Sequence, residues 1–382
     1  MTEIPPGSVA QKPGAARATA AHLYEVDIVR ILTFVCVIGV HTISHTVAPT
    51  EVPLYLLLAL LHFTRNVFFA LTAFVLVYSY LHRPKPMREF WPKRFLLVGV
   101  PYLAWSAIYF VASTLHSGTT VSFGALVLRF LGQVVTGVAW YHLYFLLVTM
   151  QVYLLLPVIL WVVRKSRGHH TLLLSVSGVI QLALIACYFY WPAATALINH
   201  YNKQYFFSYQ FFILAGAVAA DHSATFLLWV REHRPRIAVL TAIAAALTIA
   251  VYFIAVATGV PLYDAGTPLQ PVMMVWALAV CLAFLAIGTW WADRRNPAGL
   301  GTRFVKVASD RSFGIFLSHP LAIWFLLWVG DDFFERTIPT PWLTLVIYLL
   351  VIASAIAITE VARRTPLSLP LTGRPWRAKR SA

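Results

Sequence analysis

The sequence predicts an all-α integral membrane protein in which about ten transmembrane helices form one bundle. Of its 382 residues, 60% are hydrophobic and only 11% are charged, and the mean hydropathy is +0.74. A soluble domain of this size does not need so much apolar surface. Lys and Arg also gather in alternate connections between the apolar stretches, which is typical of chains that cross a membrane repeatedly.

Ten apolar stretches are long enough to cross a bilayer. They cover approximately residues 26–47, 55–81, 94–115, 140–163, 171–191, 204–220, 236–258, 270–291, 310–330 and 341–362. Short connections join them, so residues 24–362 are expected to form one membrane domain. Residues 1–23 are rich in Pro, Gly and Ala and are predicted to be a disordered tail, without a removed signal peptide. Residues 363–382 are expected to be a basic, frayed tail.

One shorter apolar segment lies in the connection after the third stretch. In residues 123–135, "FGALVLRFLGQVV", apolar side chains recur at helical spacing on one face, whereas Arg129 and Gln133 lie on the other. The segment is too short to span, so it is predicted to be an amphipathic helix on the outer side. It could cover a cavity or act only as an interfacial anchor.

The formal net charge of +15 reflects topology. Of the 29 Lys and Arg residues, 25 fall at the termini or around the connections after the second, fourth, sixth and eighth stretches; the exceptions are Arg65, Arg129, Lys203 and Arg336. Because positive residues mark the cytoplasmic side, we expect a multi-pass protein of the cell (inner, cytoplasmic) membrane with both termini in the cytoplasm. The charge indicates attraction to anionic lipids and does not indicate a nucleic-acid partner.

The first stretch combines a cation with a titratable ring. Arg30 and His41 are eleven residues apart, so an α-helix places them within about 20° of the same face and about 16 Å apart along its axis. Ionisable groups are costly at this depth unless they pair or face water, which makes His41 a candidate base. Two simpler readings stay open: the His41 ring bonds a neighbouring helix, and Arg30 only pairs with Asp27.

The ninth stretch, "SFGIFLSHP", repeats this arrangement. Ser312 and His319 are seven residues apart and therefore also share a helix face, separated by about 10 Å along the axis. Pro320 removes a backbone hydrogen bond near the level of His319 and is expected to loosen the helix there. On its own, His319 could equally be a packing or kink residue.

Polar groups also occur in the second and fourth stretches. Arg65 cannot be neutralised, so it must face a polar interior, a carboxylate or an anionic ligand, unless it extends to the outer surface. His142 and Tyr144 lie near the outer boundary of the fourth stretch, beside the aromatic residues Trp140 and Tyr141. Such residues commonly form an interfacial belt, so His142 alone is a weak signal.

Several chemistries are excluded by missing motifs. The sequence contains no nucleophile elbow, P-loop, dinucleotide-binding glycine pattern, carboxylate pair or metal-spaced Cys/His cluster. Cys36, Cys187 and Cys281 lie inside apolar runs and are expected to be core residues. We therefore expect no metal and no permanently bound cofactor. The remaining groups suit proton abstraction from a hydroxyl, with cations to hold an anionic donor.

Five short motifs resemble those of acyltransferase family three, the bacterial integral-membrane O-acyltransferases. They are Asp27, Arg30 and His41; Phe68, Phe69, Thr72, Ala73 and Phe74; Lys93, Arg94, Pro101 and Tyr102; His142, Leu143, Tyr144 and Phe145; and Ser312, Gly314, Ile315, Phe316, Leu317 and His319. The resemblance runs from about residue 24 to residue 362. Thr72 and Ala73 replace the usual Ser-Gly, and Leu97 and Val98 stand where a second arginine of the third helix would fall.

The resemblance implies transfer of an acyl group, usually acetyl, from cytoplasmic acyl-CoA to a hydroxyl, usually of a cell-envelope carbohydrate or glycolipid. His41 would be the base, with Arg30 and His319 as further catalytic groups. Donor binding would fall to Arg30, Lys93, Arg94, Arg65 and Arg311, and support to Asp27, Ser312, Tyr144 and His142. Arg65 would hold the donor or the negative charge that develops at its carbonyl. Acyl-CoA would thus be the donor substrate, and the acceptor and membrane lipids the other partners.

Other functions remain open at this point. Some relatives acylate small secondary metabolites, and an exporter or flippase of a lipid-linked or secreted glycan would also need a polar path through the bundle. A purely structural membrane partner is a third class, but it would not need the stripe that joins Arg30 to His41. Release of CoA in the presence of donor and acceptor would distinguish an enzyme from an exporter.

Overall fold

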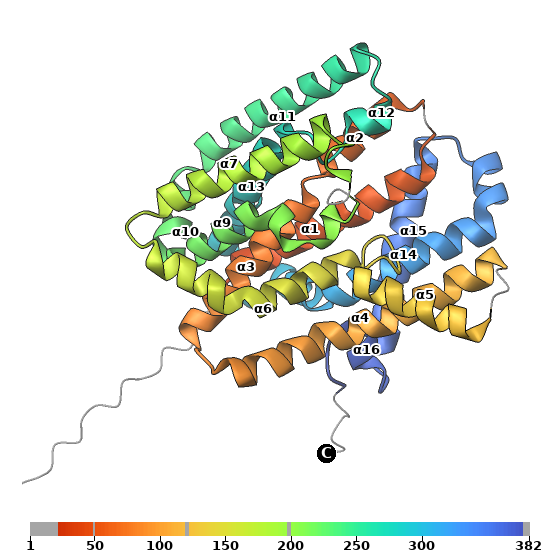
Figure 1. Cartoon of the computed structure of the whole chain (residues 1–382), viewed down its shortest axis with the longest axis horizontal. Coiled ribbons are helices and arrows are strands. Elements are labelled where there is room, and N and C mark those ends of the chain that lie inside the picture. Colours follow the sequence, from red (N-terminus) through yellow and green to blue (C-terminus); the bar gives the residue numbers. More distant parts are fainter. Residues whose placement is uncertain (1–21, 49, 119–121, 197–199, 377–382) are drawn as a thin grey trace, which may run out of the picture.

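The computed structural model describes residues 22–48, 50–118, 122–196 and 200–376 and forms a helical bundle (Figure 1). These residues contain α-helices and short 3-10 helices and no strand. Within the described ranges, nine helices are long and apolar enough to cross a membrane, or ten if one bent pair counts as a single span. The predicted fold class, an all-α multi-pass membrane protein, is confirmed.

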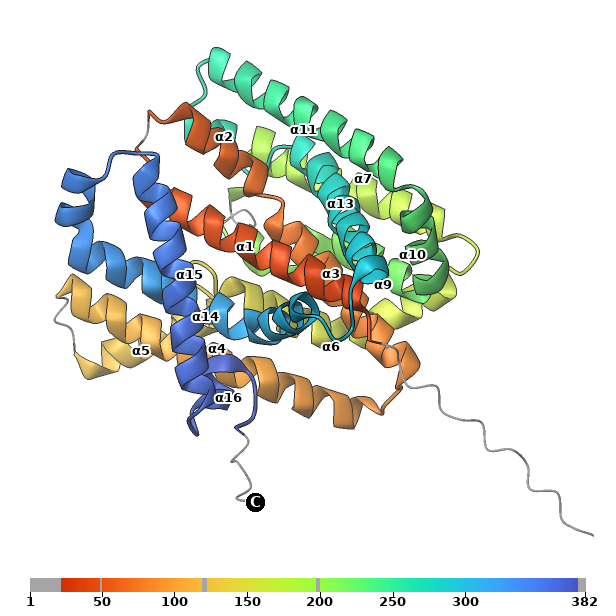
Figure 2. The same cartoon turned by 180° about the vertical axis from the view of Figure 1, so that it is seen from behind.

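The helices follow the predicted apolar stretches. Their bounds are α1 Tyr24–Thr46, α2 Val52–Leu61, α3 Thr64–His82, α4 Met87–Ser117, α5 Phe123–Thr136, α6 Tyr144–Lys165, α7 His170–Tyr190, α9 Gln210–Asp221, α10 Ser223–Glu232, α11 Arg234–Ala257, α12 Leu262–Ala265, α13 Val272–Arg294, α14 Leu300–Thr337, α15 Trp342–Arg363 and α16 Ser368–Thr372, with 3-10 turns η1 Asn202–Gln204 and η2 Phe206–Tyr209. Helix α1 contacts α2, α3, α13, α14 and α15, so it lies within the bundle (Figure 2).

The second predicted stretch is a single span built from two helices. Helix α2 ends at Leu61 and α3 begins at Thr64. At the break, the His62 Nδ1 atom lies 2.7 Å from the Gly266 carbonyl oxygen, to which it must donate because a carbonyl only accepts. Arg65, in the first turn of α3, donates to the Pro268 carbonyl at 3.0 Å. The break therefore joins the polar part of this span to the connection before α13.

The sixth predicted stretch, residues 204–220, differs from a simple span. Helix α9 ends close to the predicted boundary, and α10 follows it at once. The chain bends by 97° between residues 206–221 and 223–232. Asp221 ends α9 and forms an ion pair with Arg167 at 2.8 Å. A carboxylate is unfavourable at a helix C-terminus, so this pair stabilises the point at which the chain turns.

The ninth stretch is longer than predicted. Helix α14 contains 38 residues and extends beyond the predicted 310–330 at both ends. It continues through Pro320, so the proline does not end the helix. Helix α5 also matches its predicted range and packs beside α4 at the periphery, where Phe110 and Phe130 approach to 5.2 Å between ring centroids (Figure 1).

The expected fraying of the C-terminal tail is wrong for the residues just beyond α15. Helix α16 packs against α4, α14 and α15, and Ser368 and Thr372 are buried. The Trp105 indole donates to the Leu371 carbonyl at 3.1 Å. Gly373 has φ of +65°, and a Cβ atom there would lie 2.6 Å from Phe313. This close approach requires glycine and explains why a basic, Pro-containing segment still docks.

Ion pairs gather at the end of the bundle where α1 begins and α13 ends, here termed the charged end. Glu25 of α1 accepts from Arg231 at 2.5 Å, and Arg231 also contacts Asp293 of α13 at 3.1 Å. Arg234 pairs with the same Asp293. These ion pairs fix α10 against α1 and α13, and α11 against α13.

Candidate active site

Three histidines from distant parts of the sequence converge inside the bundle. The ring of His319 on α14 lies 5.3 Å from that of His41 on α1, with 28° between their planes, and 5.7 Å from that of His142, which precedes α6. His142 and His319 are buried, whereas His41 is half-buried. Three imidazoles without a neighbouring carboxylate cannot all be charged, so the cluster suits neutral rings that accept protons.

Pro320 fixes the orientation and tautomer of His319. In a regular helix the N–H of residue 320 would donate to the carbonyl of Phe316, but proline has no N–H. The Nδ1 atom of His319 lies 2.7 Å from that carbonyl oxygen and takes over the role of donor. Nδ1 therefore carries the proton, and Nε2 carries the free lone pair. Nε2 is buried and has no hydrogen-bond partner among the described residues.

Tyr109 of α4 repairs the same part of α14. Its hydroxyl donates to the Leu317 carbonyl at 2.8 Å and accepts from the Leu321 amide at 3.1 Å. These two backbone groups bond one another in a regular helix, so the hydroxyl is inserted into the ladder. Near Pro320, therefore, the helix loses regular backbone hydrogen bonds as the sequence predicts, but α14 continues without a break.

His41 lies at the edge of a cavity of about 440 Å³. No described residue makes a hydrogen bond to either of its ring nitrogens, and Tyr141 packs against the ring at 4.6 Å between centroids. The cavity is lined by Val37, Val40, His41, Ser44, His45, His62, Thr64, Arg65, Phe68, Tyr141, His142, Tyr144, Phe145, Lys203, Tyr263, Thr267, Pro268, Leu269 and Phe316. No residue in this lining comes from α5, so α5 does not cover this cavity.

Four phenylalanines close the cavity toward the charged end and are termed the phenylalanine floor. Phe68, Phe145 and Phe316 line the cavity, and Phe34 packs behind them at 5.3 Å from Phe68 and 5.5 Å from Phe316. Phe34 is buried and lies on α1 between Arg30 and His41. Aromatic side chains therefore occupy the space along α1 between Arg30 and His41.

Arg30 is held at the charged end through a serine. Its Nη1 atom donates to Ser309 Oγ at 3.1 Å, and Ser309 Oγ in turn donates to Asp27 at 2.6 Å. The carboxylate of Asp27 also contacts His22 Nε2 at 2.6 Å. Asp27 and Arg30 therefore interact through Ser309 of α14 and do not form only a helix-end pair.

The next cation of this region is Arg94 on α4. Its guanidinium lies over the rings of Phe90 and Tyr153, at 5.4 and 5.9 Å from their centroids. Tyr153 of α6 lies within electrostatic reach of both Arg94 and Arg30. Lys93 is exposed on the outside of α4.

The sequence comparison identifies the chemistry for which this arrangement is suited. A family model described as an acyltransferase domain, that of acyltransferase family three, matches residues 23–360 of the chain. The chain belongs to acyltransferase family three. It is therefore a membrane acyltransferase. Comparison with curated proteins and with solved structures gave no match.

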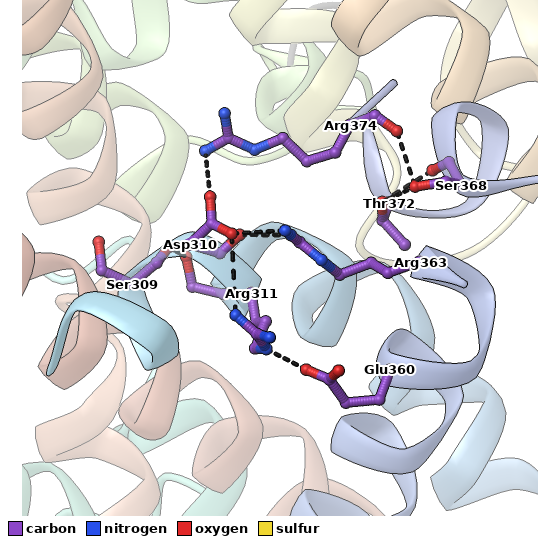
Figure 3. A network of polar contacts seen from close by, with 9 residues as sticks. Ser309, Asp310, Arg311, Glu360, Arg363, Ser368, Thr372 and Arg374 are labelled. Atoms are coloured by element: carbon purple, nitrogen blue, oxygen red, sulfur yellow. Dashed lines mark hydrogen bonds and ion pairs between the residues drawn. The ribbon is translucent and has the colours of Figure 1, made fainter. Parts of the chain in front are cut away.

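Arg311, one of the predicted site residues of the acyltransferase, lies in a polar network at the charged end (Figure 3). Arg311 forms an ion pair with Glu360 of α15. The adjacent Asp310 accepts from Arg363 at 2.6 Å and from Arg374 at 2.9 Å. Ser312 is buried and donates to the Ser309 carbonyl at 2.7 Å. Arg311 is thus committed to an internal pair, whereas Ser312 supports the serine that holds Arg30.

Arg65 and Tyr144 lie at the other side of the acyltransferase cavity, away from the charged end. Arg65 is half-buried, donates to the Pro268 carbonyl, and lies 5.8 Å from the centroid of the Tyr209 ring. Tyr144 lines the same cavity. Its side chain interacts with Arg65 and with Tyr209. Arg65 therefore faces the interior of the bundle.

One group of side chains resembles a metal site. The ligand atoms of His170, Asp221 and His222 all lie within 4.8 Å of one another. Asp221 is already bound by Arg167. His170 Nε2 contacts the Val163 carbonyl, and its Nδ1 lies 2.8 Å from His222 Nε2. Because these groups bond one another, they form a structural link between α7 and the bend after α9.

Three residues of the site were not identified from the sequence. Ser309 holds Arg30, Tyr141 packs on His41, and Lys203 lines the cavity. Ser309 directly precedes the sequence Asp310-Arg311-Ser312, and this polar run at the start of an apolar stretch could have indicated that Ser309 belongs to the site. Lys203 was visible as one of four cations outside the topological pattern, whereas Tyr141 could not be distinguished from an interfacial aromatic residue.

Proposed function

We propose that this acyltransferase moves an acyl group, most simply acetyl, from cytoplasmic acyl-CoA to a hydroxyl of a cell-envelope carbohydrate or glycolipid. The observation that carries the proposal is the position of His41, a half-buried imidazole at the edge of a cavity with neither ring nitrogen engaged by a described residue. A neutral imidazole in this position is able to accept a proton from an attacking hydroxyl.

The proposed reaction is a direct transfer. The acceptor oxygen attacks the acyl carbonyl while His41 takes the hydroxyl proton, so an oxygen–carbon bond forms. The carbon–sulfur bond then breaks, and the CoA thiolate leaves and receives the proton from the imidazolium. His319 supports this step by stacking behind His41, which holds the ring near the cavity. A ping-pong route would instead place the acyl group on the protein first.

Donor binding is assigned to the charged end. Arg30 and Arg94, both within electrostatic reach of Tyr153, would bind donor phosphates, with exposed Lys93 further out and Arg311 in its ion pair nearby. The acyl-pantetheine arm is long and thin, and it must pass the phenylalanine floor to reach His41. The floor would therefore move when donor binds, and its aromatic rings would pack along the arm.

The acceptor is assigned to the cavity. The distribution of Lys and Arg supports a cytoplasmic charged end, with the cavity toward the opposite face of the membrane. An acceptor hydroxyl that reaches His41 from the cavity would meet the acyl carbonyl at the phenylalanine floor. This division would let a cytoplasmic donor serve an acceptor on the outer side.

The decisive test is CoA release by the purified protein in detergent, with acetyl-CoA and membrane extract as acceptor source. His41→Ala is expected to lower the rate about 10²–10⁴-fold, as for other positioned bases, while CoA binding persists. His116→Ala is the matched control, because it removes an exposed histidine of α4 that lies outside the cavity lining. Wild-type turnover in His41→Ala would contradict the mechanism, and absence of CoA release from the wild type would favour an exporter. Radiolabelled protein after incubation without acceptor would indicate the ping-pong route.

A further inference from the structure

Two cations of the acceptor cavity lack a carboxylate partner. Arg65 and Lys203 both line the cavity, and none of the described residues in that lining is Asp or Glu. Neither side chain forms an ion pair with a described residue. Arg65 is half-buried, so its unpaired charge is unfavourable unless a ligand of opposite charge or water compensates it, whereas Lys203 is an exposed residue at the edge of the same cavity.

At the charged end, in contrast, several cations have carboxylate partners. There, arginines are matched with carboxylates, as in Arg231 with Glu25 and Asp293, or Arg363 and Arg374 with Asp310. The cavity of the same chain differs, because no described residue in its lining is Asp or Glu. Its two cations are consequently available to a molecule that enters the cavity.

Arg65 has unused donors. Among the described residues, its Nη2 atom donates to the Pro268 carbonyl at 3.0 Å, and the guanidinium also lies against Tyr209. Its Nε atom is buried and has no partner in the part of the chain that the structure describes. The planar guanidinium matches the spacing of two oxygens on a carboxylate or phosphate, which an uncharged hydroxyl does not offer.

The cations are grouped apart from the catalytic histidines. Arg65 and Lys203 both act electrostatically on His62, and Arg65 acts on Lys203. The groups that act on His41 in the same way are other histidines. Arg65, which bonds the Pro268 carbonyl and lies against the Tyr209 ring, is therefore assigned together with Lys203 to the acceptor.

We infer that the acceptor carries an anionic group, a carboxylate or a phosphate, which binds between Arg65 and Lys203 while a hydroxyl of the same molecule faces His41. This inference rests on the proposed function and names the class of its acceptor: an acidic sugar or a phosphate-bearing glycan or lipid. It assigns Arg65 to the acceptor in place of the donor carbonyl. The Arg65 cation acts electrostatically on Lys203, and a bound anion would relieve the repulsion between the two side chains.

The first experiment determines the charge of the product. Membranes of cells that naturally make the chain are incubated with radiolabelled acetyl-CoA, and labelled products that disappear in a His41→Ala strain are recovered. A product that binds an anion-exchange resin and retains a negative charge after mild base removes the acetyl group is expected. Mass spectrometry and phosphatase sensitivity then distinguish phosphate from carboxylate. A neutral labelled product would overturn the inference while leaving the proposed function intact, and no labelled product would overturn both.

The second experiment tests the two cations with the recovered acceptor. Lys203→Gln and Arg65→Gln are each expected to raise the acceptor KM roughly 10- to 100-fold, the loss typical of one charge-assisted hydrogen bond, with little change in the acyl-CoA KM. Lys203→Glu should be worse than Lys203→Gln because it repels the anion. Arg129→Gln is the matched control, since Arg129 is exposed on α5 outside the cavity. Unchanged acceptor KM in both cavity variants, or a rise in the donor KM alone, would refute the site.

Discussion

The imidazoles of His41 and His319 lie 5.3 Å apart and only 28° from parallel, although 278 residues separate them in sequence. One ring lines the cavity, and the other is fully buried behind it. Two stacked imidazoles at this distance disfavour each other's charged form, which favours a neutral His41 ring that is able to accept a proton. The chemistry of His41 should therefore depend on how His319 is held.

Substitution of His319 should separate its structural role from its electrostatic role. His319→Asn keeps a short side-chain N–H that is able to donate to the Phe316 carbonyl, whereas His319→Leu removes it. We expect the Asn variant to fold normally with kcat reduced about 10-fold, and the Leu variant to lose thermal stability as well. Thermal unfolding and CoA release on the same preparations provide the two readouts. Equal stability of both variants would argue against the carbonyl as the important partner.

Pro320→Ala should affect catalysis through His319. Alanine would supply the N–H that bonds the Phe316 carbonyl in a regular helix, so the His319 Nδ1 atom would lose its acceptor. We expect kcat to fall while the KM of acyl-CoA stays the same and the thermal stability holds or rises. Pro157→Ala, in the interior of α6 and outside the cavity lining, is a control for the general effect of a helix proline. An unchanged kcat would show that the tautomer of His319 is immaterial.

Arg30 should govern donor affinity. Arg30→Ala is expected to raise the KM of acyl-CoA about 10-fold or more with a smaller effect on kcat, because its charge lies about three helical turns from His41. Ser309→Ala should produce a weaker change of the same kind, since Ser309 joins Arg30 to Asp27. Arg164→Ala, an exposed cation at the end of α6, is the matched control. Loss of kcat alone in Arg30→Ala would be inconsistent with a donor site.

The proposed topology is testable by labelling. Arg88 and Asp264 are both exposed and belong to opposite sides in the positive-inside arrangement. In a variant without Cys36, Cys187 and Cys281, single cysteines at Arg88 and Asp264 should differ in their reaction with a membrane-impermeant maleimide added to intact cells. Asp264→Cys should react, and Arg88→Cys should react only after lysis. Labelling of both from outside would overturn the assignment of sides.

The docked C-terminal segment should contribute to stability. Gly373→Ala must place a Cβ atom 2.6 Å from Phe313 at φ of +65°. Gly168→Ala is an unusual matched control, because Gly168 has φ of +83° with no atom within 4 Å of the added Cβ. Both variants lose about 1 kcal/mol through the backbone, and only Gly373→Ala adds a clash. We expect a thermal midpoint lower by several degrees for Gly373→Ala than for Gly168→Ala, and equal midpoints would show that the segment is not tightly docked.

The sequence predicts the spans well because each one satisfies a local rule: about 20 apolar residues with few charges. It also predicts that Arg30 and His41 share a face, and that Ser312 and His319 do so, because helix geometry alone determines this. The approach of His142 to His319 depends on how α6 packs on α14, and that packing has no local signature. The docking of Leu371 on Trp105 is likewise tertiary, so a short segment with prolines was expected to fray.

The phenylalanine floor affects how much acyl-CoA would be lost to hydrolysis. A thioester is readily hydrolysed by an activated water molecule, and a cavity without acceptor would hold water beside a histidine base. With Phe34, Phe68 and Phe316 in contact, that water is separated from the charged end at which donor is expected to bind. Because the proposed mechanism opens the floor only when donor binds, the thioester would meet that water only in the donor-bound state, which would limit the loss of acyl-CoA by hydrolysis.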